Sequence, residues 1–111
     1  MTAEQKEKLL EIVLNDLDIT FDDEQLKKKI GRIMESGAAY LEDKFGMEID
    51  FENDKIALDL LISYCRYGRS NAAEQFAHDF KSELTALALR GAMKTATAQA
   101  EGEGAQNESK V

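Results

Sequence analysis

The single cysteine and the single histidine, Cys65 and His78, have the side chains best suited to act as nucleophile and base, and nothing in the sequence links them. On a helix, His78 would point away from the apolar stripe of Phe76 and Phe80, toward solvent. A catalytic cysteine needs a base beside it, and one cysteine with one histidine is too small a ligand set for zinc. We therefore expect no catalytic residue, no metal and no cofactor. Cys65 is expected to be a small, buried hydrophobic residue.

Acidic residues alternate with others between Asp16 and Asp22, a spacing found in calcium loops. Such a loop requires glycine at its sixth position and a bidentate glutamate at its twelfth, but this sequence has Phe21 and Lys27 there. A loop beginning at Asp50 fails in the same way. These carboxylates are better explained as helix caps, which accept hydrogen bonds from free backbone N–H groups.

Basic side chains concentrate at two places in the sequence. Lys27–Lys29 and Arg32 form one cluster, which is either a solvated helix face or a contact surface for an acidic neighbour. Arg66 and Arg69 flank Tyr67 near the end of a predicted helix, and arginine and tyrosine are enriched at protein interfaces. We predict that these last three residues contribute to a subunit interface.

The composition narrows the class of protein. The 111 residues carry 14 basic and 22 acidic side chains, and the net charge of −8 argues against binding through nucleic-acid phosphates. No apolar run approaches the roughly 20 residues that a spanning helix needs. The first residues lack the apolar stretch of a signal peptide, and a lone cysteine suits a reducing compartment. We expect a protein of the cytoplasm without membrane contact.

The elements that must position these residues are predicted to be helices. The chain contains no proline, and its apolar residues recur at three- and four-residue steps. We predict an all-α fold with one small four-helix domain over residues 1–94. A short extended segment separates the second helix from the third, and residues 95–111 form a flexible tail. The helices are predicted over about residues 3–16, 23–45, 55–67 and 72–94.

The helix starts carry capping signals. Thr2 and Gln5 have capping-box spacing at the first helix. For the second helix we predict Asp22 as the N-cap, with Phe21 and Leu26 as the two residues of a hydrophobic staple. These capping residues and the staple therefore predict two helix starts within the first quarter of the chain.

Later boundaries are marked by glycine, asparagine and aspartate. Gly46 and Gly68 are the predicted stops of the second and third helices, because glycine readily adopts the left-handed conformation. Asn53 or Asp54 is predicted to cap the third helix, and Asn71 the fourth.

Two further glycines, Gly31 and Gly37, lie inside the predicted second helix. Each costs about 1 kcal/mol of helix stability relative to alanine. We attribute them to close helix packing, with a bend in the helix as the alternative.

Three apolar residues, Met47, Ile49 and Phe51, alternate with acidic residues, which is the two-residue period of an extended segment. The apolar side packs over the helices, or the segment pairs with another chain, since a lone strand leaves backbone groups unpaired. We include these three residues in the predicted subunit interface.

The last segment of the chain, residues 95–111, has no large apolar residue before Val111. It cannot bury enough surface to order itself alone. Its one basic and three acidic residues give a charge of −2, which leaves −6 on the helical domain. The segment is either a solvated tail or becomes ordered on a partner.

The order of these features resembles the head–tail connector family of tailed bacteriophages, in the versions encoded by siphophages and prophages of Gram-positive bacteria. The resemblance lies in the short leucine-rich first helix, the turn over residues 17–23, the end of the second helix over 39–46 and the segment over 60–72. It covers roughly residues 6–94. One departure is that many members have a Pro-Phe-Gly-like segment before the last helix, whereas this chain runs through Phe76 and Phe80 without proline.

The resemblance implies a virion structural protein without enzymatic activity. Family members form a ring, usually dodecameric, beneath the portal of the filled head, and this ring extends the DNA channel and carries the next connector or the tail. The implied location is the virion neck, after assembly in the host cytoplasm, and the implied partners are the portal protein, other copies and the next connector or tail-completion protein. DNA passes through such a ring without specific binding, and some members are labelled DNA packaging proteins.

The tail is the candidate for docking on the portal. The residues assigned to that contact by the resemblance are Thr95, Gln99, Glu101, Glu103, Gln106, Lys110 and Val111. The alternative function is an acidic helical regulatory module that binds a host or phage protein. An enzyme is the least favoured class, because no nucleophile, base or metal set is grouped.

Overall fold

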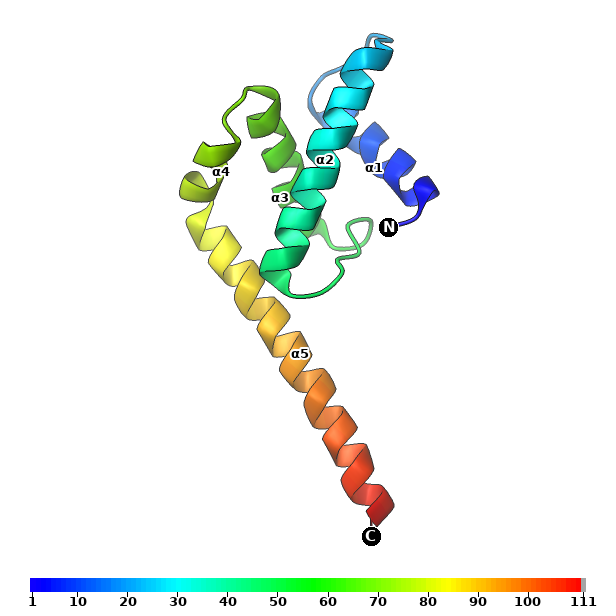
Figure 1. The fold of residues 1–111 in the computed structure, drawn as a ribbon, viewed down its shortest axis with the longest axis vertical. Coiled ribbons are helices and arrows are strands. Elements are labelled where there is room, and N and C mark those ends of the chain that lie inside the picture. Colours follow the sequence, from blue (N-terminus) through cyan, green and yellow to red (C-terminus); the bar gives the residue numbers. More distant parts are fainter. Residues whose placement is uncertain (111) are drawn as a thin grey trace.

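The computed structural model describes the backbone of residues 1–110 and the side chains of residues 1–98, and it is helical with no strand over that range. The helices are α1 (Ala3–Asp16), α2 (Glu24–Phe45), α3 (Lys55–Arg69), α4 (Ala73–Asp79) and α5 (Lys81–Lys110) (Figure 1). The predicted all-α class is confirmed, and the predicted count of four helices is wrong by one. None of the helices described is both long and apolar enough to cross a membrane.

The first helix has the predicted bounds and the predicted cap. The Thr2 side chain accepts a hydrogen bond from the Gln5 backbone N–H, and the Gln5 side chain accepts one from Thr2. Leu9 and Val13, on the predicted apolar stripe, are fully buried. Local sequence therefore suffices to place α1.

The second helix begins one residue later than predicted. Its N-cap is Asp23, whose side chain accepts a hydrogen bond from the Leu26 backbone N–H at 3.1 Å. With this shift, Asp22 and Lys27 take the two positions of a staple, and they form an ion pair at 2.9 Å. Phe21 is 55% exposed. The predicted cap and staple were wrong because two adjacent aspartates, Asp22 and Asp23, can each act as the N-cap, and Asp23 does so.

The core is built around the antiparallel pair α2 and α3. A Cβ atom at Gly37 would lie 2.6 Å from Cδ1 of Tyr64, so close packing at this glycine is confirmed. At Gly31 the nearest atom to such a Cβ is on Leu10, at 4.0 Å, and close packing does not account for that glycine. Cys65 is fully buried in this core, as predicted.

The third helix starts at its predicted cap and ends later than predicted. The Asp54 side chain accepts a hydrogen bond from the Ala57 backbone N–H at 3.1 Å. Gly68 does not end the helix, because it lies inside α3 against Ile33, where a Cβ would be 2.6 Å from Cγ2. Asn71, with φ of 57°, takes the left-handed conformation in the turn that follows.

The predicted fourth helix is two helices, α4 and α5, separated at Phe80. No side chain caps the start of α4, so the predicted Asn71 cap is wrong. The apolar stripe continues across the break, but on α4 it packs against α3, whereas on α5 it packs mainly against α2. Phe76 is fully buried in the aromatic cluster on α3, whereas Leu84 and Leu87 lie on α5, which packs mainly on α2. A straight helix would not contact both partners, and the chain turns between α4 and α5 (Figure 1).

The segment between α2 and α3 is irregular and packs on its own subunit. Gly46 ends α2 in the left-handed conformation, with φ of 91°, as predicted. Ile49 and Phe51 are 9% and 2% exposed, and the Ile49 backbone N–H donates to the Glu42 carboxylate at 3.0 Å. Of the two alternatives for this segment, the structure therefore shows packing over the helices.

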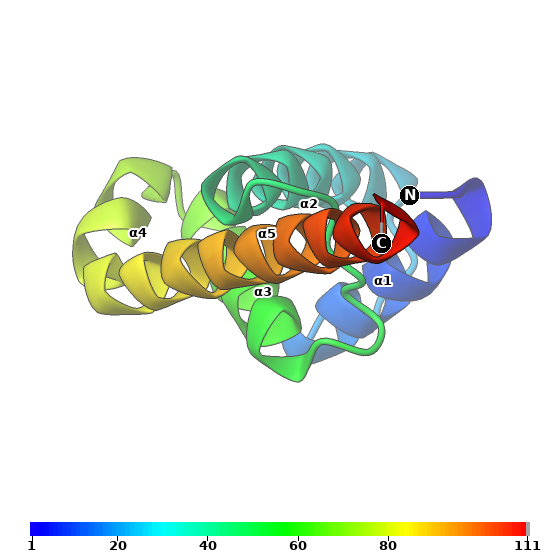
Figure 2. The same cartoon turned by 90° about the horizontal axis from the view of Figure 1, so that it is seen from below.

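The last helix crosses the end of α2 and then leaves the helical body (Figures 1 and 2). At the crossing, Gly91 lies directly against the backbone of Phe45. The helix was expected to end near Lys94 but continues to Lys110. Alanine, glutamine and glutamate are good helix formers, and no proline interrupts them. One helix thus spans the predicted boundary between domain and tail, and the molecule measures 63 × 31 × 17 Å.

Candidate functional site

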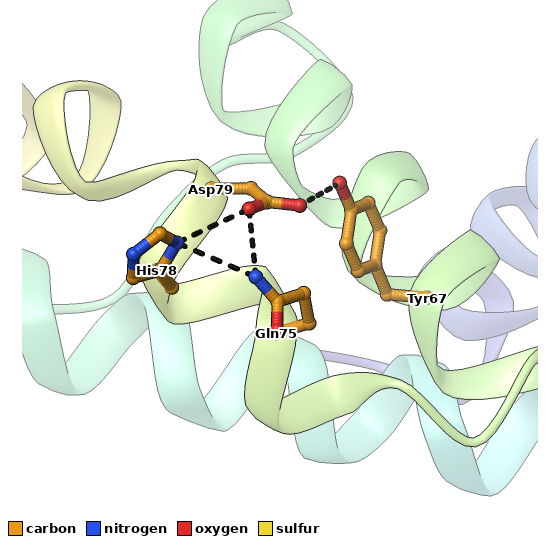
Figure 3. A network of polar contacts seen from close by, with 4 residues as sticks. All are labelled: Tyr67, Gln75, His78 and Asp79. Carbon is orange, nitrogen blue, oxygen red and sulfur yellow. Dashed lines mark hydrogen bonds and ion pairs between the residues drawn. The ribbon is translucent and has the colours of Figure 1, made fainter.

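The most connected polar network joins α3 to α4 through Tyr67, Gln75, His78 and Asp79 (Figure 3). The Tyr67 hydroxyl donates to the Asp79 carboxylate at 2.7 Å, and Gln75 donates to the other carboxylate oxygen at 3.0 Å. Nδ1 of His78 lies 3.3 Å from both Gln75 and Asp79. The His78 side chain is 82% exposed, as the sequence predicted.

The electrostatics of this network oppose catalysis by its tyrosine. The hydrogen bond to Asp79 raises the pKa of Tyr67, so the hydroxyl stays protonated. Hydrogen bonds from Gln75, Tyr67 and His78 lower the pKa of Asp79, so the carboxylate stays ionised. A base that activates a nucleophile needs a pKa near the working pH. The network's effect is to fasten α4 onto α3.

Two of the three predicted interface residues at the end of α3 bond within the subunit. Tyr67 packs edge-on against Phe76 and Phe80, with ring centroids 5.8 and 5.7 Å apart. The Arg69 guanidinium donates to the backbone carbonyl of Leu17 at 3.2 Å. Arg66 is exposed and free to meet another molecule.

The structure does not bring the two predicted interface groups together. Residues 66–69 lie at the end of α3, whereas residues 47–51 lie on the other side of the α2–α3 pair (Figure 1). Met47 is half-buried, and Ile49 and Phe51 belong to the core. These three side chains therefore offer little apolar surface to a neighbouring subunit.

The side chains assigned to portal docking follow the crossing of α5 over α2. Thr95 is exposed, and its hydroxyl donates to the Gly91 carbonyl at 3.0 Å. The other six assigned residues lie outside the side chains that the structure describes: Gln99, Glu101, Glu103, Gln106, Lys110 and Val111.

Sequence reasoning missed two exposed apolar residues on α5. Leu89 and Met93 are 61% and 62% exposed and stand one turn apart on the same helix face. Alanines border them at positions 86, 92 and 96. Their signal in the sequence is a second apolar stripe, offset from the one that Leu84, Leu87 and Gly91 form.

The exposed face formed by Leu89 and Met93 is held in position by Arg90, on the adjacent side of α5. The Arg90 guanidinium meets both carboxylate oxygens of Asp54, at 2.9 and 3.2 Å, and lies 5.4 Å from the ring centre of Phe45. Burial would raise the pKa of Asp54, but hydrogen bonds from Arg90 and the Ala57 N–H, with the charges of Arg90 and Lys94, lower it overall. The ionised pair ties α5 to the start of α3.

Cys65, the remaining candidate for a nucleophile, is unreactive in this fold. Cys65 is fully buried, and burial raises the pKa of its thiol to about 12. A thiol in that environment is not a nucleophile at neutral pH. Among the side chains of residues 1–98, no three of His, Cys, Asp and Glu are grouped to hold a metal ion.

Comparisons with known proteins found no match: no family model fits the chain, and no curated protein or solved structure is significantly similar to it. The resemblance to head–tail connectors therefore rests on the residues quoted for it, and the geometry of α5 is the feature to which a function can be attached.

Proposed function

We propose that the chain is a head–tail connector subunit of a tailed bacteriophage. Copies form a ring that joins the portal of the DNA-filled head to the tail, and the ring extends the DNA channel. The observation that supports this proposal is the shape of α5, which is anchored to the helical body by Arg90 and Gly91 and then projects from it (Figure 1).

The projecting helix offers a surface suited to a groove on a partner. Exposed apolar side chains one turn apart, here Leu89 and Met93, are the anchors by which helices bind in grooves. The flanking alanines allow the partner backbone to approach closely. The anchor between Arg90 and Asp54 holds α5 at the crossing before binding and limits its direction to a narrow range, which lowers the entropy cost of docking.

The charge of the chain is compatible with a DNA conduit. A net charge of −8 repels phosphates, so a duplex can slide past a ring of such subunits without adhering. The partners in this proposal are the portal, neighbouring copies and the next connector or tail component.

The test is to mix the protein with the portal encoded by the same genome and to measure the mass of the complex. We expect one copy bound per portal subunit. A chain that ends at Lys94 keeps Leu89 and Met93 but lacks residues 95–111. It should fold and lose attachment, because we expect portal docking to need both parts of α5. A folded wild-type protein that leaves the portal mass unchanged would refute the proposal, and salt-sensitive competition with DNA for a host protein would then favour the acidic regulatory module.

Point substitutions separate the docking face from the rest of the surface. The double variant Leu89→Ser/Met93→Ser removes exposed apolar area without touching the core, so we expect normal thermal stability and portal affinity lower by roughly 100-fold. Ile12→Ser/Phe21→Ser is the matched control, since both residues are exposed on other elements, at 37% and 55%. Equal losses in the two variants would show that α5 has no special role.

A further inference from the structure

A groove of about 680 Å³ opens between α2 and the turn from α3 to α4. Lys29 and Arg32 of α2 line one wall, and Tyr64 and Gly68 of α3 line the other. Glu74, at the start of α4, is the acidic residue among its lining. The groove is therefore basic along α2 and partly aromatic along α3.

The two basic side chains of this groove have no ion-pair partner among the side chains described. Lys27, the first residue of the same basic cluster, is paired with both Asp22 and Glu24. Lys29 and Arg32 form no such pair and are exposed. Their charge is available to an acidic group from outside the subunit.

A row of acidic side chains lies on the opposite side of the α2–α3 pair. Glu48, Asp50 and Glu52 are all exposed, because Ile49 and Phe51 hold the alternate positions in the core. The segment bends after Asp50, whose backbone carbonyl accepts hydrogen bonds from the N–H groups of Asn53 and Asp54. Glu48 lies 3.7 Å from the N-terminal amine, and Asp50 accepts a hydrogen bond from Asn53, yet the Glu48 side chain remains 88% exposed.

We propose that the acidic segment 48–52 of one copy docks in the groove beside Lys29 and Arg32 of the next copy. This inference rests on the proposed function, because it names the contact between neighbours in the ring. In Figure 1, the turn from α3 to α4, which borders the groove, and the segment between α2 and α3 lie on opposite sides of α2. Each copy can therefore give and receive one contact, and head-to-tail contacts of this kind form a ring when the rotation between neighbours closes.

The occupant is a second copy for two physical reasons. The complementary surface is present on the same chain, and its packing on the core fixes its shape before binding, which reduces the ordering cost. Nucleic acid is disfavoured as occupant, because the net charge of the chain is −8 and a duplex is a long polyanion.

A charge exchange tests the contact in the assembled complex. Lys29→Glu/Arg32→Glu and, separately, Glu48→Lys/Glu52→Lys should each raise the concentration that half-fills the ring on the portal by roughly tenfold. A chain carrying all four substitutions should recover to within about threefold of wild type. Lys8→Glu/Lys81→Glu, with the same charge change at exposed positions outside the groove, is the control.

Disulfide trapping tests the geometry independently. Ser36 lines the groove and is exposed, so Ser36→Cys on one chain should cross-link to Glu52→Cys on another, on the portal and in concentrated protein alone. The buried native Cys65 should not take part. Pairing Ser36→Cys with Ser82→Cys, which is exposed on α5, should give no cross-link.

The outcomes for this contact and for the proposed function can be told apart. If both charge-reversal double variants fill the ring normally and Ser36→Cys does not cross-link to Glu52→Cys, the proposed contact is wrong, while portal binding stands. A cross-link between copies of a protein that never binds the portal would support the contact and refute the connector function.

Discussion

At the scale of single residues, the crossing of α5 over α2 depends on Gly91. A Cβ added there would overlap the carbonyl oxygen of Phe45, and backbone cannot move aside as a side chain can. We expect Gly91→Ala to lower the free energy of unfolding by about 2–3 kcal/mol in urea denaturation followed by circular dichroism.

The matched control for this substitution is Gly31→Ala, also inside a helix. The nearest atom to its new Cβ is 4.0 Å away, on Leu10, and the change should raise the free energy of unfolding by about 0.5–1 kcal/mol. If the two variants have equal stability, α5 does not cross α2 as described.

The ion pair between Asp54 and Arg90 makes stability depend on pH. The folded pKa of Asp54 is lower than its unfolded value near 4, so its ionised form stabilises the fold above about pH 4. This contribution is lost as the pH falls through the lower, folded pKa. Asp54→Asn keeps an N-cap but removes the charge, and should cost about 1–2 kcal/mol near pH 7.

The measurement for this prediction is the difference in unfolding free energy between wild type and Asp54→Asn across pH. The difference should shrink toward zero as the pH falls below about 4, near the unfolded pKa of aspartate, and through the lower folded pKa of Asp54. Asp59→Asn, exposed on the same helix, should differ little from wild type at any pH. A difference that stays constant down to about pH 2 would rule out the charge of Asp54 as its cause.

At the scale of elements, α4 is a short helix held by one polar tie and an aromatic cluster. Tyr67→Phe removes the hydrogen bond to Asp79 but keeps the ring against Phe76 and Phe80. We expect a small loss of local stability, visible as faster amide hydrogen exchange in residues 73–79. His78→Ala should leave that exchange unchanged, because this side chain is 82% exposed.

The helices whose limits are set locally were predictable from sequence, and those set by packing were not. The capping box of Thr2 and Gln5 placed the start of α1 correctly, because every contact lies within four residues. The break at Phe80 has no local signal, since the apolar stripe runs through it and only its partners differ. Gly68 was assigned to a helix end, but packing against Ile33 explains it.

At the scale of the whole molecule, the projection of α5 is measurable in solution. The Cα radius of gyration is 17.0 Å, whereas a compact chain of this length has about 13 Å. Deleting residues 95–111 should reduce the radius from small-angle X-ray scattering to about 12–13 Å, because the removed part lies outside the body. A decrease of less than about 1 Å would indicate that α5 folds back in solution.

The candidate surfaces were only partly predictable, because packing between helices decides which apolar side chains stay exposed. The lack of large apolar residues after Lys94 marked residues 95–111 as a separate segment, but it did not predict that α5 continues through them to Lys110. The exposed pair Leu89 and Met93 was missed, because a sequence cannot show which of two apolar stripes on one helix the body covers. Likewise, the alternation in residues 47–51 indicated which side chains face inward, but not that the helices of the same subunit bury them.

The crossing at Gly91 also gives α5 the mechanics of a lever. Beyond this fulcrum, about 19 residues at 1.5 Å each place Lys110 about 28 Å away. A tilt of about 10° at the crossing would move that tip by about 5 Å, while Phe45 and Gly91 shift by only fractions of an ångström. In the proposed ring, each subunit could thus adjust its reach to a partner of different curvature without repacking its core.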